Sequence, residues 1–420
     1  MKNLLTLFIC LLLMTCMIST SLAETQTNIT GQIRLRDEYD KRQFDPDNNH
    51  MQTFSLLRTR VQIEAYVDSN SHAVVQIQDS RELGGMNAQG QPVSGTLNDD
   101  EGAGIHQAYV QVDRIAVDGL GLKAGRFEFS LGNERVFGAV GWDNVGRAWE
   151  GGQFWFNHEK FKLTAFGLKA LEKNNAYDNQ DFDIFGGQFA LKAFDWDVFA
   201  FYEYNADTTN LFFGIRRLER FNIGTYYYRM YRNFDFTGNF NYQAGKIPAG
   251  DYPLSEAKLD IRAFMFTAEA GYTIEGAAKA RLALGIDYSS GDDDPTDSTY
   301  HTYDNAYYTG HKFRGAMDYF VKSETAGLVD FMLRGRVDPA PMWTIAADVH
   351  FFSTAKDYTD YLGNTTKSVG SEIDLSITTS VVPGVHFTGG ASIFNAKESF
   401  AGYANADPGF WGYTMATVDF

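Results

Sequence analysis

The chain of 420 residues contains only two cysteines, Cys10 and Cys16, and both lie within its first 23 residues. If this segment is removed on export, the remaining chain has no thiol. It then cannot hold a thiolate metal site and cannot use a cysteine as a nucleophile. Both classes of site are therefore excluded for residues 24–420.

The first 23 residues have the parts of a secretory signal peptide. Lys2 supplies a positive start, an apolar run follows, and Ser21-Leu22-Ala23 provides a small-x-small cleavage site. The run is shorter than the ~20 apolar residues that a transmembrane anchor needs, and Cys16 fits a lipoprotein site poorly. We therefore predict a signal peptide over residues 1–23, followed by the mature chain over residues 24–420.

Positive charge is also scarce, because 36 Lys and Arg stand against 53 Asp and Glu and give a net charge of −17. Nucleic-acid-binding proteins carry an excess of basic residues, so no nucleic-acid partner is predicted. Beyond the signal peptide, no apolar run reaches the ~20 residues of a membrane helix. A membrane β-barrel stays open, because its strands cross the bilayer with only ~9–11 alternating residues.

Aromatic residues and glycine are abundant: Phe, Trp and Tyr make up 15% of the chain, and there are 40 glycines. This composition excludes a disordered chain and a collagen-like repeat. Within residues 57–65, Leu, Thr, Val, Ile and Ala alternate with Arg, Arg, Gln and Glu. The same alternation recurs at 280–287, 331–337 and 373–377. A period of two predicts β-strands.

The pattern gives nineteen candidate strands, whereas bacterial membrane barrels normally have an even number. Tight turns such as 68–71 and 338–341 alternate with long polar loops such as 83–104. This alternation slips by one within 209–231, so we predict one strand there rather than two. The predicted fold is all-β: a single transmembrane antiparallel β-barrel of eighteen strands, or sixteen as the fallback, with short periplasmic turns and long extracellular loops. A soluble β-sandwich, whose strands also alternate, is the competing interpretation.

The C-terminus supports the barrel. The chain ends on Phe420, in an alternating segment that starts at Phe410, and this resembles the assembly signal of outer-membrane barrels. Aromatic clusters such as 154–156 and 226–228 suit interfacial girdles. We predict a multi-pass barrel in the cell outer membrane. Its expected partners are outer-membrane lipid and lipopolysaccharide, the barrel-assembly machinery, and a polysaccharide or small polar solute.

Several short motifs follow one another in the middle of the chain. Gly125-Arg126-Phe127-Glu128, with Gly132 and Arg135 after it, forms a GRxE…GxxR pattern, and further matches lie at 142–147, 290–320 and 370–374. In their order and spacing these segments resemble the alginate export porin family of Gram-negative outer membranes. The resemblance implies a single barrel of eighteen strands whose lumen passes a polysaccharide such as alginate, or smaller polar solutes. A general diffusion porin without polysaccharide specificity is the alternative within the same fold.

Arginines recur on the polar side of the predicted strands. Guanidinium groups match carboxylates, so a row of them lets an anionic sugar move between weak sites. The alternation assigns to this pore-lining set Arg34, Arg36, Arg58, Arg60, Arg334 and Arg336. The family resemblance adds Arg126, Glu128, Arg135 and Arg147. Large barrels also brace their walls with Arg–acid pairs, and bracing is the competing role for each arginine.

Acidic residues gather in segments that we expect to be external loops. Clustered carboxylates can hold Ca²⁺, and a candidate metal site consists of Asp292, Asp293, Asp294 and Asp297. A solvated loop without a metal is the alternative. The surrounding loop, 289–326, is predicted to fold inward as a constriction with a short helix around 315–322.

Motifs of known enzymes are missing. The eight histidines show neither HExxH nor His-x-His spacing, and the sequence has no Gly-x-Ser-x-Gly or Gly-Lys-Ser/Thr. An outer-membrane barrel hydrolase, with a Ser–His pair assembled from distant strands, and a secreted soluble glycan-binding or glycan-cleaving protein are the alternatives. We predict no enzymatic activity and no resident cofactor beyond the Ca²⁺ candidate. The predicted function is an outer-membrane channel for polar, anionic solutes or a polysaccharide.

Overall fold

The computed structural model describes residues 26–84, 102–172, 181–206, 217–249, 257–276, 278–294 and 296–420. The predicted signal peptide lies outside these residues, so it stays a prediction. No helix in the described part of the chain is long and apolar enough to cross a membrane.

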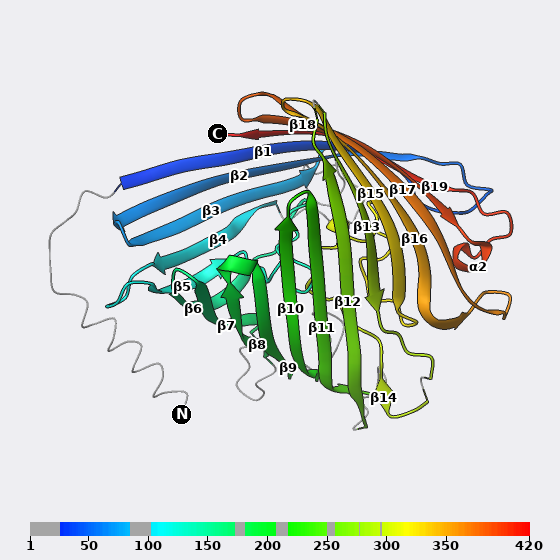
Figure 1. The fold of residues 1–420 in the computed structure, drawn as a ribbon, viewed down its shortest axis with the longest axis horizontal. Coiled ribbons are helices and arrows are strands. Elements are labelled where there is room, and N and C mark those ends of the chain that lie inside the picture. The colour runs from blue at the N-terminus through cyan, green and yellow to red at the C-terminus, as the bar shows by residue number, and fades with distance from the viewer. Residues whose placement is uncertain are drawn as a thin grey trace.

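The described residues form one antiparallel sheet that closes on itself (Figure 1). Of its nineteen strands, β14 has two residues and lies inside a loop beside β12, which leaves eighteen strands in the barrel wall. The ladder between the first and last strands closes the barrel and leaves no free edge. The strands are β1 (Gln26–Lys41), β2 (Gln52–Asp68), β3 (Ser71–Glu82), β4 (Gly102–Val112), β5 (Leu120–Phe127), β6 (Trp149–Asn157), β7 (Phe161–Leu171), β8 (Phe182–Leu191), β9 (Trp196–Asn205), β10 (Glu219–Tyr231), β11 (Phe234–Pro248), β12 (Lys258–Ile274), β13 (Lys279–Ser289), β14 (Thr299–Tyr300), β15 (Leu328–Ala340), β16 (Trp343–Thr359), β17 (Thr365–Val382), β18 (Val385–Ala396) and β19 (Gly409–Asp419). The short helices are η1 (Lys192–Phe194), η2 (Gly310–Lys312) and α2 (Glu398–Ala401).

The prediction of eighteen strands is confirmed. The segment with the irregular alternation holds a single wall strand, β10, which pairs with β9 on one side and β11 on the other. Residues 207–216 lie outside the described part of the chain.

The two faces of the wall are inverted relative to a soluble protein. On β1, Ile33 and Leu35 are 42% and 37% exposed on the outside, whereas Arg34 and Arg36 are each 4% exposed. On β13 the outward Leu284 is 68% exposed. A soluble sandwich would bury these aliphatic side chains against a second sheet. An apolar outside and a polar inside is the arrangement of a barrel surrounded by lipid.

Connection lengths alternate as predicted. Two-residue turns at 69–70, 232–233, 341–342 and 383–384 lie at one end of the barrel. Gly384 has φ +72°, as the tight hairpins of twisted strands require. Long connections join the strands at the other end, and both ends of the wall sequence lie at the turn side. This asymmetry is typical of bacterial outer-membrane barrels with periplasmic turns and external loops.

Two long connections fold into the barrel and fill part of it. We name residues 128–148 the first inner loop and residues 290–327 the second inner loop. Their aromatic side chains build two apolar clusters with the inner face of the wall. The first cluster includes Phe127, Phe137, Trp149, Phe201 and Tyr307, and the second includes Met317, Phe320, Phe352, Phe394 and Trp411. One of the cavities left inside the barrel lies along the polar strands β1 and β2.

The predicted inward fold of the second inner loop is confirmed, but the predicted helix around 315–322 is wrong. Gly315 and Asp318 have φ of +80° and +58°, which interrupt a right-handed helix. The N–H groups of Ala316 and Met317 donate to wall carboxylates rather than to carbonyls one turn earlier. A single 3₁₀ turn, η2, forms before this segment.

Two adjacent residues of β17 allow a test of which face of the wall lies in lipid. Leu375 is 54% exposed on the outside, and Ser376 faces a cavity on the inside. We expect Leu375→Arg to destabilise the barrel by roughly 2–4 kcal/mol, since it places a cation in lipid, and Ser376→Arg to cost much less. Urea unfolding in lipid vesicles, followed by heat-modifiable gel migration, measures both. Equal destabilisation by the two substitutions would contradict the assigned faces.

Candidate functional site: the polar wall and the inner loops

The inner face of β1–β4 carries a continuous set of polar side chains, which we name the polar wall. The strand period of two brings them to one face, because they alternate with outward residues such as Val75 and Ile77. Its members are Gln32, Arg34, Arg36, Arg58, Arg60, Gln62, Gln76, Gln78 and His106.

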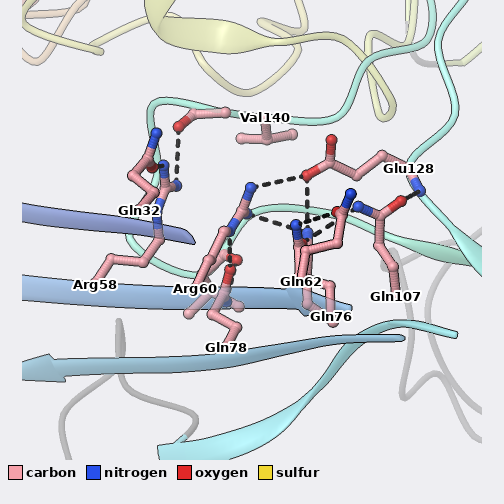
Figure 2. Close-up of polar contacts among 12 residues, drawn as sticks. Gln32, Arg58, Arg60, Gln62, Gln76, Gln78, Gln107, Glu128 and Val140 are labelled. Carbon is pink, nitrogen blue, oxygen red and sulfur yellow. Dashed lines mark hydrogen bonds and ion pairs between the residues drawn. The ribbon is translucent and has the colours of Figure 1, made fainter. Parts of the chain in front are cut away.

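One end of the polar wall is a network around Arg60 and Glu128 (Figure 2). Arg60 donates to Gln78 Oε1 at 2.6 Å and lies 3.1 Å from the Glu128 carboxylate. His106 Nε2 lies 2.8 Å from the same carboxylate. Gln107 accepts the backbone N–H of Glu128 and donates to Gln76. Every charge in this part of the wall therefore has an ionic or amide partner.

The other arginines of the polar wall bind the backbone of the first inner loop. Arg34 donates to the carbonyls of Gly141 and Asp143, each at 3.0 Å, and Arg58 donates to the same two carbonyls, each at 3.0 Å. Arg36 donates to the carbonyl of Trp142 at 2.8 Å. Three guanidinium groups thus hold three successive carbonyls.

These contacts leave two positive charges without a counter-charge. Arg36 forms a 2.7 Å ion pair with Glu38, but within the described residues neither Arg34 nor Arg58 has a carboxylate at ion-pair distance. Both side chains are about 95% buried, and their Nε atoms have no hydrogen-bond partner in the described part of the chain. A carbonyl is a neutral acceptor, so these hydrogen bonds do not neutralise the two guanidinium groups; the nearest acids of the adjoining cavity, Glu128 and Glu134, pair with Arg60 and Lys312.

A cavity of about 550 Å³ adjoins these arginines. Gln32, Arg34 and Arg58 line it from the wall, and Trp142, His311 and Lys312 line it from the two inner loops. The Trp142 and His311 rings stack at 3.8 Å, and the Arg36 guanidinium lies 4.3 Å from the centre of the Trp142 ring on the wall side. The two inner loops therefore meet at the arginines.

Buried ion pairs and backbone contacts fix the inner loops to each other and to the wall. Arg135 from the first loop and Arg314 from the second share the fully buried carboxylate of Asp287 on β13. Burial lowers the pKa of the Arg135 guanidinium, and the nearby Arg314 lowers it further. Arg147 donates to the carbonyl of Tyr307 at 2.8 Å.

Carboxylates of β17 fix the second inner loop. Met317 N–H donates to Glu372 at 2.8 Å, and Ala316 N–H donates to Asp374 at 3.3 Å. The adjacent His350 lies 2.8 Å from Asp330. The wall thus holds one loop by its carbonyls with arginines and the other by its N–H groups with acids.

The predicted lumen residues separate into three groups. The structure brings together Arg34, Arg36, Arg58, Arg60 and Glu128, and it places Arg135 and Arg147 within the first inner loop. Arg334 and Arg336 lie on another part of the inner wall. Their role in passage stays a prediction for all of these residues.

Arg334 and Arg336 act mainly in bracing. Arg334 lies 3.6 Å from Glu269 and 3.7 Å from Asp348, and it donates to a loop carbonyl at 3.2 Å. Arg336 lies 3.1 Å from Asp338 at the turn end of the barrel.

With Val140 and Arg147 of the first inner loop, Arg126 lines a cavity apart from the polar wall, and its role in passage stays a prediction. The neighbouring Phe127 is fully buried in the interior, so Arg126 takes the outward position of β5. There it lies 3.5 Å from the exposed Glu150 at the rim. The alternation around Gly125 is too irregular to reveal this from the sequence.

Sequence reasoning missed several polar residues of the lumen. The glutamines of β3 alternate with valine and isoleucine, and this pattern indicates a polar inner face next to the arginines of β2. Lys123 and Lys162 lie on the inner face near the turn end, where their Nζ atoms lie 4.4 Å from the Tyr109 ring centre and 5.3 Å from the Trp155 ring centre. Neither lysine has a carboxylate at ion-pair distance within the described residues.

The acidic loop uses its carboxylates on its own backbone. Asp292 accepts the N–H groups of His301 and Asp294, Asp294 accepts that of Thr296, and Asp297 accepts that of Thr299. Asp293 lies 3.1 Å from Lys356. In the described part of the chain no group of three or more His, Cys, Asp or Glu residues is arranged to hold a metal ion. The Ca²⁺ prediction is not tested, and these carboxylates do not converge as a ligand set.

A comparison with protein families gives the identity of the chain. The model of the family described as "Alginate export" matches residues 25–406. The chain belongs to the alginate export family. A comparison with curated proteins found no match.

Alginate export proteins share their fold with solved outer-membrane porins. The chain is similar to OccAB1 of Acinetobacter baumannii, with a TM-score of 0.60, 12% identity, and coverage of 96% of this chain and 98% of that one. It is similar to a BenF-like porin from Pseudomonas fluorescens Pf-5, with a TM-score of 0.59, 11% identity, and coverage of 95% and 100%. It is also similar to Pseudomonas aeruginosa OccK2 (OpdF), solved in complex with glucuronate, with a TM-score of 0.58, 12% identity, and coverage of 94% and 98%. Family and fold identify a porin-type outer-membrane barrel.

Asp287 is the test of how the inner loops are anchored. We expect Asp287→Asn to release the second inner loop, since it leaves Arg135 and Arg314 buried without their shared counter-charge, a loss of roughly 3–5 kcal/mol. Limited trypsin digestion of the folded barrel should then cleave after Lys312 and Lys322 faster than in the parent protein. Asp293→Asn, which removes only an exposed ion pair, is the matched control. Unchanged cleavage in Asp287→Asn would show that other contacts hold the loop.

Proposed function

We propose that this protein conducts small solutes that carry carboxylate or other oxyanion groups passively across the outer membrane, with sugar acids as the first class to test. The observation that carries the proposal is the pair Arg34 and Arg58. They adjoin a cavity of about 550 Å³ and have no ion-pair partner within the described residues. Guanidinium groups without counter-charges favour anions over cations of equal size.

Two further features support an anionic solute. Lys123 and Lys162 form a second pair of basic residues near the turn end. Their ammonium groups make cation–π contacts with aromatic rings and have no carboxylate at ion-pair distance within the described residues. The glutamines of the polar wall offer amide donors and acceptors that suit sugar hydroxyl groups. The glucuronate bound to OccK2, a porin of the same fold, is a ligand of this chemical class.

Alginate is the second candidate, because the family model describes alginate export. Alginate is a polymer of uronic acids, so the same arginines suit it. A polymer needs a continuous bore, and the two inner loops occupy much of the interior. Small acids therefore fit the described lumen better than a polysaccharide chain.

For the environment we propose outer-membrane lipid and lipopolysaccharide around the apolar outer face. We also propose the barrel-assembly machinery as the partner for insertion. The closed wall with its inverted faces supports both proposals.

We propose that the channel catalyses no reaction. Ser380, His386 and Asp419 form a Ser–His–Asp array at the turn end, with 2.7 Å between Ser380 Oγ and His386 Nδ1 and 3.5 Å between His386 Nε2 and Asp419. The His386 and Asp419 side chains are nearly half exposed, and none of the described cavities includes the array. A catalytic triad needs a positioned substrate and an oxyanion hole.

Uptake of charged and neutral sugars tests the proposal. We expect Arg34→Gln with Arg58→Gln to lower the ratio of glucuronate to glucose uptake in liposome-swelling assays. One charge at 4 Å in water is worth about 1 kcal/mol, which is about a fivefold change. Arg334→Gln with Arg336→Gln is the matched control, because acids already neutralise those arginines. An equal fall in both double variants, or none in the first, would contradict the proposal.

The hydrolase alternative has its own test. We expect the purified barrel to release no p-nitrophenol from short-chain and long-chain esters above background, and Ser380→Ala to leave both esterase signal and glucuronate uptake unchanged. Esterase activity that disappears in Ser380→Ala would establish the enzyme instead.

A further inference from the structure

We infer that the arginine pair of the polar wall is an oxyanion-binding site that the protein's own backbone occupies, so that a permeating anion displaces the first inner loop when it binds. We name residues 139–147 of that loop the strap. The inference rests on the proposed function, since it assigns to the same arginines a gate that the anion itself operates.

The carbonyl oxygens of the strap occupy the hydrogen-bond donors that a carboxylate ligand would use. Arg34 and Arg58 each donate to the carbonyls of Gly141 and Asp143 at 3.0 Å. Two acceptor oxygens held by one guanidinium is also the geometry of a bidentate carboxylate. A carboxylate adds a negative charge, and charge-assisted hydrogen bonds are roughly twice as strong as neutral ones. An anion therefore competes for these donors with an advantage that the carbonyls lack.

An anion has access to the arginines from the adjoining cavity. This cavity of about 550 Å³ is lined by both arginines and by Lys312, and it adjoins Gly141 and Trp142 of the strap. The Nε atoms of Arg34 and Arg58 are buried without a hydrogen-bond partner in the described part of the chain. These two N–H groups are donors that the strap leaves unused, and an oxyanion can accept hydrogen bonds from them once it has displaced the strap.

The strap is fixed at both ends, and different wall residues hold its two halves. Its ends are joined by the Arg147 N–H, which donates to the Ala139 carbonyl at 2.8 Å. Next to it, Gly138 N–H donates to Tyr307 O at 2.8 Å and so fixes the base of the strap to the second inner loop. Between these ends, Arg34, Arg36 and Arg58 hold the carbonyls of residues 141–143. Ser80 and Gln78 of β3 hold the next two carbonyls, those of Asn144 and Val145. Residues 141–143 are therefore the part of the strap that an anion releases. Val140, a β-branched residue, has φ +55°, a conformation that its side chain disfavours and that release would relieve.

The competing interpretation is that the arginines only brace the loop. In that case an anion passes beside a fixed strap, and the strap does not respond to it. The two interpretations differ in whether strap mobility depends on the concentration of the anion.

A single spin label on the strap distinguishes them. The chain beyond residue 23 has no cysteine, so Gly141→Cys provides a unique thiol in the mature barrel, and a Cβ at Gly141 meets no atom within 4 Å. We expect the mobile fraction of the label, in folded protein in lipid vesicles, to rise and saturate with glucuronate. Glucose, and sodium chloride at equal ionic strength, should leave it unchanged. Gly104→Cys on β4, whose Cβ also meets open space, is the control label and should not respond.

Arg34→Lys in the labelled protein provides the second measurement. Arg34 binds the Gly141 and Asp143 carbonyls through Nη1 and Nη2, whereas lysine keeps the charge but has one nitrogen and cannot form this fork. We expect a mobile strap without any anion, and tighter apparent glucuronate binding. If the strap covers the arginines in about nine of ten parent molecules, only about one in ten can bind glucuronate. The apparent affinity of the parent protein for glucuronate is then about tenfold weaker than the intrinsic affinity. Heat-modifiable migration confirms that each variant is folded.

Two results would overturn the inference. One is a label at residue 141 that stays immobile when glucuronate saturates its uptake, and the other is an immobile strap in Arg34→Lys. If selective uptake of glucuronate still depends on Arg34 and Arg58 in that case, the proposed function stands and only the gate is wrong. If uptake is unselective while the strap responds, the arginines form a binding site that does not determine passage.

Discussion

The alternation of side chains along each wall strand is the constraint on which the rest of the structure depends. A shift of one residue would exchange the two faces of a strand and move its arginines into lipid. The ladder between β1 and β19 pairs the last free edges, so every strand satisfies its backbone within the wall. With the outside apolar and the edges closed, polar and charged residues have only the interior left. The site is a direct consequence of the wall.

The interior must then satisfy these buried polar groups, and the two inner loops provide many of their partners. The first presents carbonyls to arginines of β1 and β2, and the second presents N–H groups to Glu372 and Asp374 of β17. Their aromatic residues pack against β5–β9 and β16–β19 in two clusters. One cavity lies along the polar wall, where two arginines have neutral partners only. In the proposed function, selectivity and loop anchoring therefore depend on the same side chains.

The wall could be predicted from the sequence because a period of two is a local property. It located the strands, the turn and loop sides, and the inward position of Arg34 and Arg58. It failed where packing between distant segments decides. Gly315 begins no helix because wall carboxylates bind the next two N–H groups. The carbonyl partners of the arginines also lie about a hundred residues away in the chain, and no local sequence pattern predicts these contacts.

The central claim is that water and uncompensated positive charge lie inside this barrel. The reversal potential of the unmodified protein in a planar bilayer, measured under a potassium chloride gradient, tests that claim most directly. Our account predicts ion conductance with a reversal potential toward the chloride equilibrium value, and weaker anion preference as ionic strength rises. A barrel that inserts but does not conduct, or one that prefers potassium, would contradict it.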